Sequence, residues 1–171
     1  MSNEWFTPAK YIEAAREVMG SIDLDPASCE LANQTVKSTR YFTQEDNGLV
    51  QEWKAKNLWL NPPYSAEALI NPIRFWISKL ISEYEQGNVE QAMVLVTAGS
   101  ERKWFQPLWQ HPICFPNHQI VFNRLNDVPA HKRQSNCFVY LGPNEQKFTE
   151  VFSKFGTMVK RVSLPVEVGA A

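Results

Sequence analysis

Four consecutive residues, Asn61-Pro62-Pro63-Tyr64, combine groups that could act together on a planar ring bearing an amino group. An exocyclic amine is a poor nucleophile when its lone pair is delocalised into the ring. If Asn61 Oδ1 and the Pro62 carbonyl accept both amine hydrogens, the lone pair turns toward an electrophilic methyl group. The prolines would fix this geometry, and Tyr64 could stack on the ring. The tetrapeptide therefore predicts methyl transfer to an amine, with Asn61, Pro62, Pro63 and Tyr64 as catalytic residues.

This chemistry requires neither a covalent intermediate nor a base acting before the attack, so the lack of a Ser/His/Asp or Cys/His set is consistent with it. Methylation of a ring carbon such as cytosine C5 is disfavoured, because it needs a nucleophilic cysteine and no cysteine follows a proline here. The alternative interpretation of the tetrapeptide is a proline-rich turn that Asn61 caps. Its position directly after an apolar strand pattern favours the catalytic interpretation.

A second polar segment, Asp23-Leu24-Asp25-Pro26-Ala27-Ser28, also follows a predicted strand. Ligands of open α/β sheets bind at the carboxyl ends of the strands, so this segment is a candidate ligand site. No Gly-x-Gly follows the strand, and Ala27 and Ser28 stand in its place. The alternative interpretation is a helix that simply starts at Asp-Pro.

Strand and helix patterns alternate along the chain and predict an α/β fold, a mostly parallel central sheet with helices on both faces. We expect Thr7 to cap the first helix, with Pro8 at its first position, and Gly20 to end it. Asn71-Pro72 should start a long helix that ends at Gly87. The other predicted helices cover 28–36, the stretch from Ser100 and the stretch around Phe148 to Phe155, and the predicted strands cover 21–24, 41–43, 57–60, 92–96, 112–122, 136–141 and a last stretch to Val162.

Composition predicts one domain, residues 1–165, followed by a disordered tail, residues 166–171. The net charge of −1 lacks the basic excess of proteins that coat nucleic acid, so any contact with DNA must be local. We expect a cytoplasmic protein, since no apolar run approaches the roughly 18 residues of a membrane span and no signal peptide is present. We expect no metal site and no disulfide, and we interpret Cys29, Cys114 and Cys137 as small core residues.

The chain resembles the phage-type DNA N-6-adenine methyltransferases of the Dam family. The resemblance rests on four segments, which occur in this order: Glu4-Trp5-Phe6-Thr7-Pro8, Asp23 to Ser28, Asp46-Asn47-Gly48-Leu49 with Trp53, and Asn61-Pro62-Pro63-Tyr64-Ser65. A looser match continues through residues 119–122 and 139–142. It implies an abridged, Rossmann-like S-adenosylmethionine-dependent methyltransferase fold, because few residues separate Pro26 from Leu60.

The resemblance also implies S-adenosylmethionine as cofactor and adenine N6 as the target. It places the segment containing Asp23, Asp25, Pro26, Ala27 and Ser28 against the methionine part of the cofactor. By the same resemblance, Trp5, Thr7 and Pro8 flank this pocket, and Asp46 and Leu49 lie near the cofactor adenine.

A target adenine inside double-stranded DNA would have to flip into the pocket. Arg124, Lys132 and Arg133, in the irregular stretch 123–135, are the candidates for DNA contact. Two alternatives remain open: the same chemistry on RNA or on a protein glutamine amide, and an inactive relative that only binds DNA. The recognition sequence, the oligomeric state and the biological role stay open as well.

Overall fold

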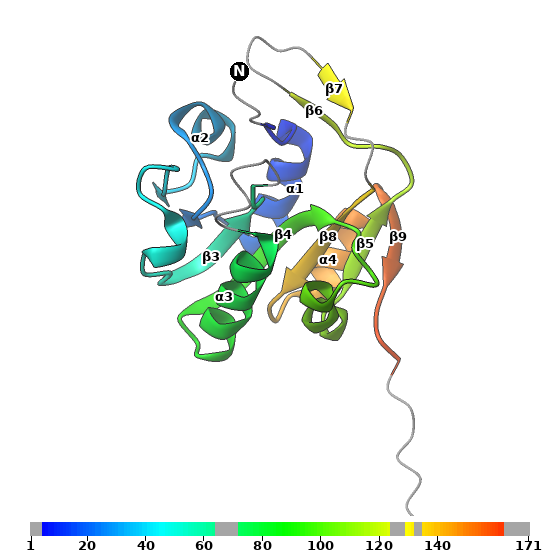
Figure 1. Cartoon of the computed structure of the whole chain (residues 1–171). Helices are drawn as coiled ribbons and strands as arrows, with labels where there is room; N and C mark the ends of the chain where they lie inside the picture. The colour runs from blue at the N-terminus through cyan, green and yellow to red at the C-terminus, as the bar shows by residue number, and fades with distance from the viewer. Residues whose placement is uncertain (1–4, 64–71, 124–128, 132–134, 163–171) are drawn as a thin grey trace, which may run out of the picture.

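The computed structural model describes residues 5–63, 72–123, 129–131 and 135–162. Within these ranges, seven strands form one sheet and two more form a separate hairpin (Figure 1). The sheet strands are β1 Leu24–Asp25, β2 Arg40–Tyr41, β3 Ala55–Leu60, β4 Val89–Thr97, β5 Ile113–Pro116, β8 Asn136–Leu141 and β9 Gly156–Val159, and the hairpin strands are β6 Val121–Asn123 and β7 Pro129–His131. The helices are α1 Ala9–Met19, α2 Glu30–Val36, α3 Ile73–Glu85 and α4 Glu145–Phe152, with the 3-10 helices η1 Gly48–Val50 and η3 Lys103–Gln110.

The sheet is mixed, and the expectation of a mostly parallel sheet is wrong. Its order is β2-β1-β3-β4-β8-β5-β9. The pairs β2–β1, β1–β3 and β3–β4 are parallel, whereas β4–β8, β8–β5 and β5–β9 are antiparallel. The α/β class and the helices on both faces are confirmed.

The change of direction has a topological cause. The connection from β4 to β5 through η3 leaves one position in the sheet vacant between these two strands. After β5, the chain forms the β6–β7 hairpin and returns as β8, with no helix among the described residues between β5 and β8. A strand that returns from the same end of the sheet must run antiparallel to its neighbours, and β8 fills the vacant position in that way.

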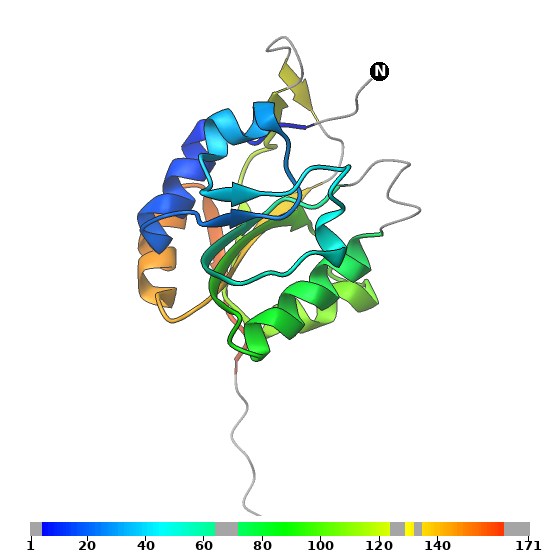
Figure 2. The same ribbon diagram turned by 90° about the vertical axis from the view of Figure 1, so that its left-hand side faces the viewer.

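Two apolar layers lie on opposite faces of the sheet, as alternation along the strands requires. Trp59 and Met93 belong to the layer under α1 and α4, whereas Leu58 and Val94 belong to the layer under α3 and η3. Figure 2 shows α1 and α4 on one side of the sheet and α3 on the other. The strands β3, β4 and β8 are therefore buried on both faces, which explains their continuous apolar runs.

Three local expectations are corrected by the structure. Pro8 is the N-cap of α1 and no side chain caps that helix, so Thr7 is not its cap. Cys29 is half-buried, and its Sγ accepts a hydrogen bond from Ala32 N at the start of α2, so it is not a core residue. The helix expected from Ser100 is the 3-10 helix η3, whose Pro107 has no N–H for an α-helical hydrogen bond.

Several boundaries differ from the sequence patterns. The stretch 112–122 holds two strands, β5 and β6, and the last described strand ends at Val159. The helices α1 and α3 end before Gly20 and Gly87, as expected, and both glycines have positive φ. Among the described residues, no helix is long and apolar enough to cross a membrane. The predicted tail, residues 166–171, lies outside the described residues.

A buried hydrogen-bond network joins β3, β4 and β8 near the amino end of β4. Gln91 Nε2 donates to Asn57 Oδ1 at 2.7 Å and to Met19 O at 3.3 Å. Gln91 Oε1 accepts from the Tyr140 hydroxyl at 2.6 Å, and that hydroxyl accepts from Asn144 N at 3.1 Å. Because buried polar groups are costly when unpaired, this network stabilises one register of the three central strands.

Tyr140→Phe should lower the free energy of unfolding by about 1–3 kcal/mol, because it deprives Gln91 Oε1 and Asn144 N of their short hydrogen bonds. Urea denaturation of both proteins measures the change. Tyr41→Phe is the control, since the Tyr41 hydroxyl makes no hydrogen bond within the described part of the chain. An equal effect of the two substitutions would contradict a special role for the network.

Candidate active site

The candidate site lies where β1 and β3 end side by side. The chain leaves β1 toward β2 on one side, and β3 then occupies the other side of β1. In open α/β sheets, ligands bind at such a switch of direction, beyond the carboxyl ends of the two strands, and we call this edge of the sheet the crevice. Asp25 ends β1 and Pro26 follows it at this edge, and Asn61-Pro62 follows β3. The two segments chosen from the sequence therefore come together.

Asn61 has one amide atom paired and one left open. Its Nδ2 donates to the Thr7 hydroxyl at 3.2 Å. Its Oδ1 is buried and has no hydrogen-bond partner among the described residues. Pro62 is buried and Pro63 is exposed, while Tyr64 lies outside the described residues. The open oxygen is an acceptor available to a ligand that brings an N–H or O–H group.

The residue at the end of β1, Asp25, carries a buried carboxyl group, only 3% exposed. Its Oδ1 accepts from Ala27 N at 3.2 Å. Burial raises the pKa of this carboxyl group to about 7, although the Ala27 amide and the adjacent Ser28 hydroxyl act in the opposite direction. A group that titrates near neutrality inside a crevice is a frequent feature of functional sites.

The η1 segment packs tightly on the turn after β1. A methyl group at Gly48 would lie 1.9 Å from the Pro26 carbonyl oxygen, so only glycine fits there. Trp53 Nε1 donates to the Gly48 carbonyl at 2.7 Å, and the Trp53 ring stacks on Trp76 of α3. No glycine occurs in the turn directly after β1, but Gly48, from a later segment, brings its backbone close to the Pro26 carbonyl in that turn.

Buried polar atoms without a partner gather in this region. Five such side-chain atoms occur among the described residues, and four of them lie in the turn after β1, at the start of η1, after β3 and in α3 where it packs against η1. These four are Ser28 Oγ, Asn47 Oδ1, Asn61 Oδ1 and Trp76 Nε1. The Ser28 hydroxyl lies near the Asp25 carboxyl but does not form a well-shaped hydrogen bond to it. Since folded proteins pair nearly all buried polar groups, this concentration indicates a binding site for a polar ligand.

Sequence reasoning missed Asn47 and Trp76 as site residues. Asn47 precedes Gly48 and has φ of 50°, and its side-chain oxygen is one of the unpaired atoms. Trp76 lies on the apolar face of α3, and its ring belongs to the core while its ring nitrogen is unpaired. The available signals were the Asp46-Asn47-Gly48 turn motif and the hydrogen-bonding tip that every tryptophan carries.

The other predicted cofactor residues are spread more widely. Asp46 is exposed, and hydrogen bonds from the Thr43 backbone N–H and hydroxyl lower the pKa of its carboxyl group. Leu49 is half-buried against the α3 layer. The Asp23 carboxylate accepts from Ser21 Oγ and from Asn57 N, one residue before β1 begins. The structure thus places the Asp23 carboxylate at the amino end of β1, on the side of the strand away from the crevice end, together with Ser21 and Asn57.

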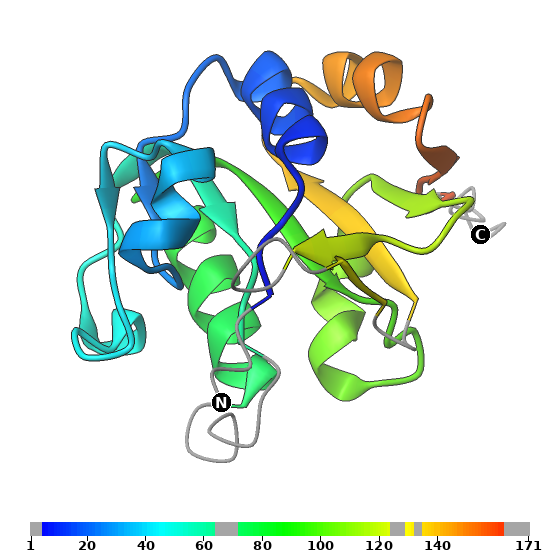
Figure 3. The ribbon, with the colours of Figure 1, turned by 90° about the horizontal axis from the view of Figure 1, so that it is seen from above.

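The N-terminal segment runs beside the end of β3 and the β6 strand (Figure 3). Trp5 packs edge-to-face on Phe122, with ring centroids 6.1 Å apart, and Phe6 bridges Asn123. Thr7 is buried and Pro8 precedes α1. The predicted DNA contacts Arg124, Lys132 and Arg133 lie outside the described residues.

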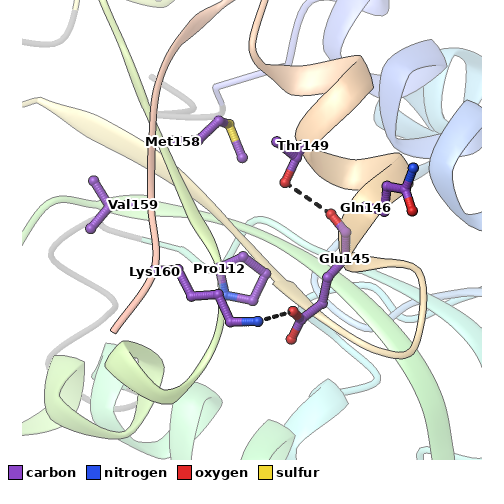
Figure 4. A pocket seen from close by; sticks show the side chains of 7 residues that line it. All are labelled: Pro112, Glu145, Gln146, Thr149, Met158, Val159 and Lys160. Carbon is purple, nitrogen blue, oxygen red and sulfur yellow. Dashed lines mark hydrogen bonds and ion pairs between the residues drawn. The ribbon is translucent and has the colours of Figure 1, made fainter. Parts of the chain in front are cut away.

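A surface hollow between α4 and β9 is unrelated to these residues. It is lined by seven side chains, among them Glu145 and Lys160, which form an ion pair (Figure 4). It lies at the β9 edge of the sheet, whereas the crevice lies between β1 and β3. Within the described ranges, no group of three or more His, Cys, Asp or Glu side chains could hold a metal ion.

Comparison with known proteins gives a consistent result. The family model described as DNA N-6-adenine-methyltransferase (Dam) matches residues 1–139. A protein of Escherichia phage T1 named DNA N-6-adenine-methyltransferase is 32% identical over 102 residues, which cover 59% of this chain and 38% of the relative. One of the same name from Haemophilus phage HP1 (strain HP1c1) is 33% identical over 126 residues, 73% of this chain and 64% of the relative. The match thus spans less than two thirds of either relative, and no solved structure matches significantly.

Gly48→Ala should lower the free energy of unfolding by about 1–3 kcal/mol, because the new methyl group overlaps the Pro26 carbonyl and forces η1 away from the crevice. Urea denaturation followed by tryptophan fluorescence measures it. Val50→Ala is the matched control in the same 3-10 helix, since Val50 is 74% exposed and its truncation should have little effect. A Gly48→Ala protein as stable as the wild type would disprove the close contact.

Asp25 should make the stability depend on pH. Its pKa of about 7 in the folded protein exceeds the ordinary value of 3.8, so its protonated form favours folding. That contribution is full below about pH 4 and is lost as the pH rises through 7. From pH 4 to pH 8, the wild type should therefore lose up to about 4 kcal/mol relative to Asp25→Asn.

Urea denaturation of the two proteins across this pH range tests the Asp25 effect. Asp46→Asn is the control, because the Asp46 carboxylate is exposed and its pKa is lowered. That variant should retain the wild-type loss of stability toward pH 8. Parallel pH profiles for the wild type and Asp25→Asn would exclude a buried, neutral carboxyl group.

Proposed function

Because this chain belongs to the DNA N-6-adenine-methyltransferase (Dam) family, we propose that it transfers a methyl group from S-adenosylmethionine to the N6 amine of adenine in DNA. The observation that carries the proposal is the open Asn61 Oδ1 in the crevice beyond β1 and β3. An amine hydrogen is the kind of partner this buried acceptor lacks.

The residues after β3 would act on the amine directly. Asn61 Oδ1 accepts one amine hydrogen, and the Pro62 carbonyl accepts the other. Both acceptors become more favourable as the nitrogen gains positive charge in the transition state, so they stabilise that state more than the bound substrate. Pro62 and Pro63 restrict the backbone, which keeps the two oxygens in place before the substrate arrives. Tyr64 is proposed to stack on the adenine ring.

The crevice suits a cationic cofactor. S-adenosylmethionine supplies a methyl group activated by a positively charged sulfur, and its methionine part carries an ammonium group. The Asp25 carboxyl group is the buried acid at the end of β1 and would hold this cationic part. Ser28 Oγ, Asn47 Oδ1 and Trp76 Nε1 are unpaired polar atoms that the cofactor could satisfy. No phosphate is present in this cofactor, so a glycine-rich phosphate loop is not required.

The proposal of DNA as substrate is supported by the family description and by the names of both phage relatives. An adenine in double-stranded DNA is enclosed by its neighbours, so it must leave the stack to reach a crevice of this kind. The proposed DNA contacts are Arg124, Lys132 and Arg133, whose positive charge suits phosphate groups.

The purified protein should transfer labelled methyl groups from S-adenosylmethionine to DNA that lacks N6-methyladenine. Mass spectrometry of the digested DNA identifies the modified base. Asn61→Ala should lower kcat by about 100-fold or more, because it removes one of two acceptors preorganised for the charged nitrogen. Asn88→Ala, at an exposed asparagine before β4, is the matched control and should keep wild-type activity.

RNA and glutamine-containing protein acceptors belong in the same assay, since they also present conjugated amines. Methylation of either in preference to DNA would replace the proposed substrate, and recovery of N4-methylcytosine alone would replace the proposed base. Unchanged activity in Asn61→Ala would overturn the role of Asn61. Binding to DNA without any binding of S-adenosylmethionine would favour a DNA-binding protein without enzymatic activity.

A further inference from the structure

Thr7 and Asn61 are 54 positions apart, yet their side chains meet in the candidate site. Asn61 Nδ2 donates to Thr7 Oγ1 at 3.2 Å, and Thr7 is only 7% exposed. The Thr7 hydroxyl is not needed for the helix that follows, because Pro8 is the N-cap of α1 and no side chain caps that helix. Its described hydrogen bond is the one from the Asn61 amide.

The amide of Asn61 can adopt two orientations that exchange its oxygen and its nitrogen. An amine in the site brings hydrogens, so it pairs only with the orientation in which Oδ1 faces it. In that orientation Nδ2 points at Thr7, and both ends of the amide are satisfied. The flipped orientation would direct the amide N–H groups at the amine N–H groups, and two donors cannot pair.

The geometry points to Thr7 as a positioning residue that pairs the Asn61 amide nitrogen when the amide oxygen faces the target amine, an inference that rests on the proposed methyl transfer. Without the Thr7 hydroxyl, the productive orientation would leave Nδ2 buried and unpaired, which is unfavourable. The hydroxyl also accepts from the amide nitrogen, and hydrogen bonds in a chain polarise one another. Oδ1 therefore becomes a stronger acceptor as the amine nitrogen gains positive charge.

The backbone around Thr7 is held on both sides. On one side, Phe6 N donates to Asn123 O at 2.9 Å, and Asn123 N donates to Phe6 O at 3.0 Å. On the other side, Pro8 leads into α1, where its carbonyl accepts from Tyr11 N at 3.1 Å. A β-branched side chain on a fixed backbone has few rotamers, so the hydroxyl has a defined position. This rigidity is what a positioning residue requires.

Thr7→Val tests the inference, because valine keeps the shape of threonine and removes the hydroxyl. Steady-state methyl transfer to one DNA oligonucleotide should show kcat lowered by about 10- to 100-fold in Thr7→Val, with KM for DNA and the Kd of S-adenosylmethionine within about threefold of wild type. Thr7→Ser should restore most of kcat. Thr149→Val, on an exposed face of α4, is the matched control and should behave as wild type.

The double variant Thr7→Val with Asn61→Ala separates action through Asn61 from independent action. If Thr7 acts through Asn61, the double variant should be no slower than Asn61→Ala alone. Additive losses would overturn the inference, as would equal losses in Thr7→Val and Thr7→Ser, which would indicate a packing role. Weaker cofactor binding with kcat unchanged would make Thr7 a cofactor contact instead. Thermal unfolding confirms that each variant is folded.

A measurement independent of turnover covers the case in which the wild type transfers no methyl group and the proposed function fails. The side-chain amide of Asn61 gives an NMR signal pair that is assigned by its loss in Asn61→Ala. In Thr7→Val, the amide hydrogen facing Thr7 should shift and exchange faster with water, and Thr7→Ser should reverse both changes. An unaltered signal in Thr7→Val would refute the pairing itself.

Discussion

The register that sets Leu24 of β1 opposite Leu58 of β3 brings the ends of these two strands to one edge of the sheet. This pairing places the two segments on which the candidate site is built, the turn after β1 and the residues after β3. It brings Asp25 at the end of β1 and Asn61 after β3 to the same edge of the sheet, although 36 positions separate the two residues. Both strands are anchored by apolar layers, so the polar residues that follow them inherit fixed positions.

Buried polar groups are hydrogen-bonded to one another at one end of the parallel strands and are left unpaired at the other end. Near the amino end of β4, Gln91, Asn57 and Tyr140 pair with one another, and the network contributes stability. At the crevice, Asp25 is buried with a raised pKa and Asn61 keeps an unpaired acceptor. Unsatisfied groups destabilise the folded protein, so their concentration at one end is expected where a ligand completes the pairing.

Much of this could be predicted from the sequence. Apolar periodicity gave the positions of α1, α3 and β4, and four short motifs predicted the family, which the family match confirmed. Strand direction could not be predicted, because periodicity shows that 136–141 is a buried strand but not which way it runs. The polar stretch before it, whose sequence shows no helical apolar pattern, was the available signal for an antiparallel return.

Within the site, the chemical roles of single residues could be predicted from the sequence, but the contacts between residues distant in the sequence could not. The chemistry of Asn61 follows from its side chain and its neighbours, whereas its bond to Thr7 depends on how β3 meets the N-terminal segment. Helix-capping statistics favoured a local role for Thr7, and the tertiary contact replaced that role. Gly48 is similar, because nothing local indicates that its backbone must touch Pro26.

The N-terminal segment links three parts of the molecule over four residues. Trp5 and Phe6 attach it to β6, Thr7 attaches it to Asn61, and Pro8 begins α1. Phe6, which is hydrogen-bonded to Asn123 of β6, directly precedes Thr7, so the β6–β7 hairpin is joined through one peptide unit to the residue that pairs with the proposed catalytic amide. A displacement of β6 on DNA would act on Phe6 through its two backbone hydrogen bonds and hence on Thr7. By contrast, α4 and β9 lie beyond the family match and pack against α1 and β5, so they complete the core and not the crevice.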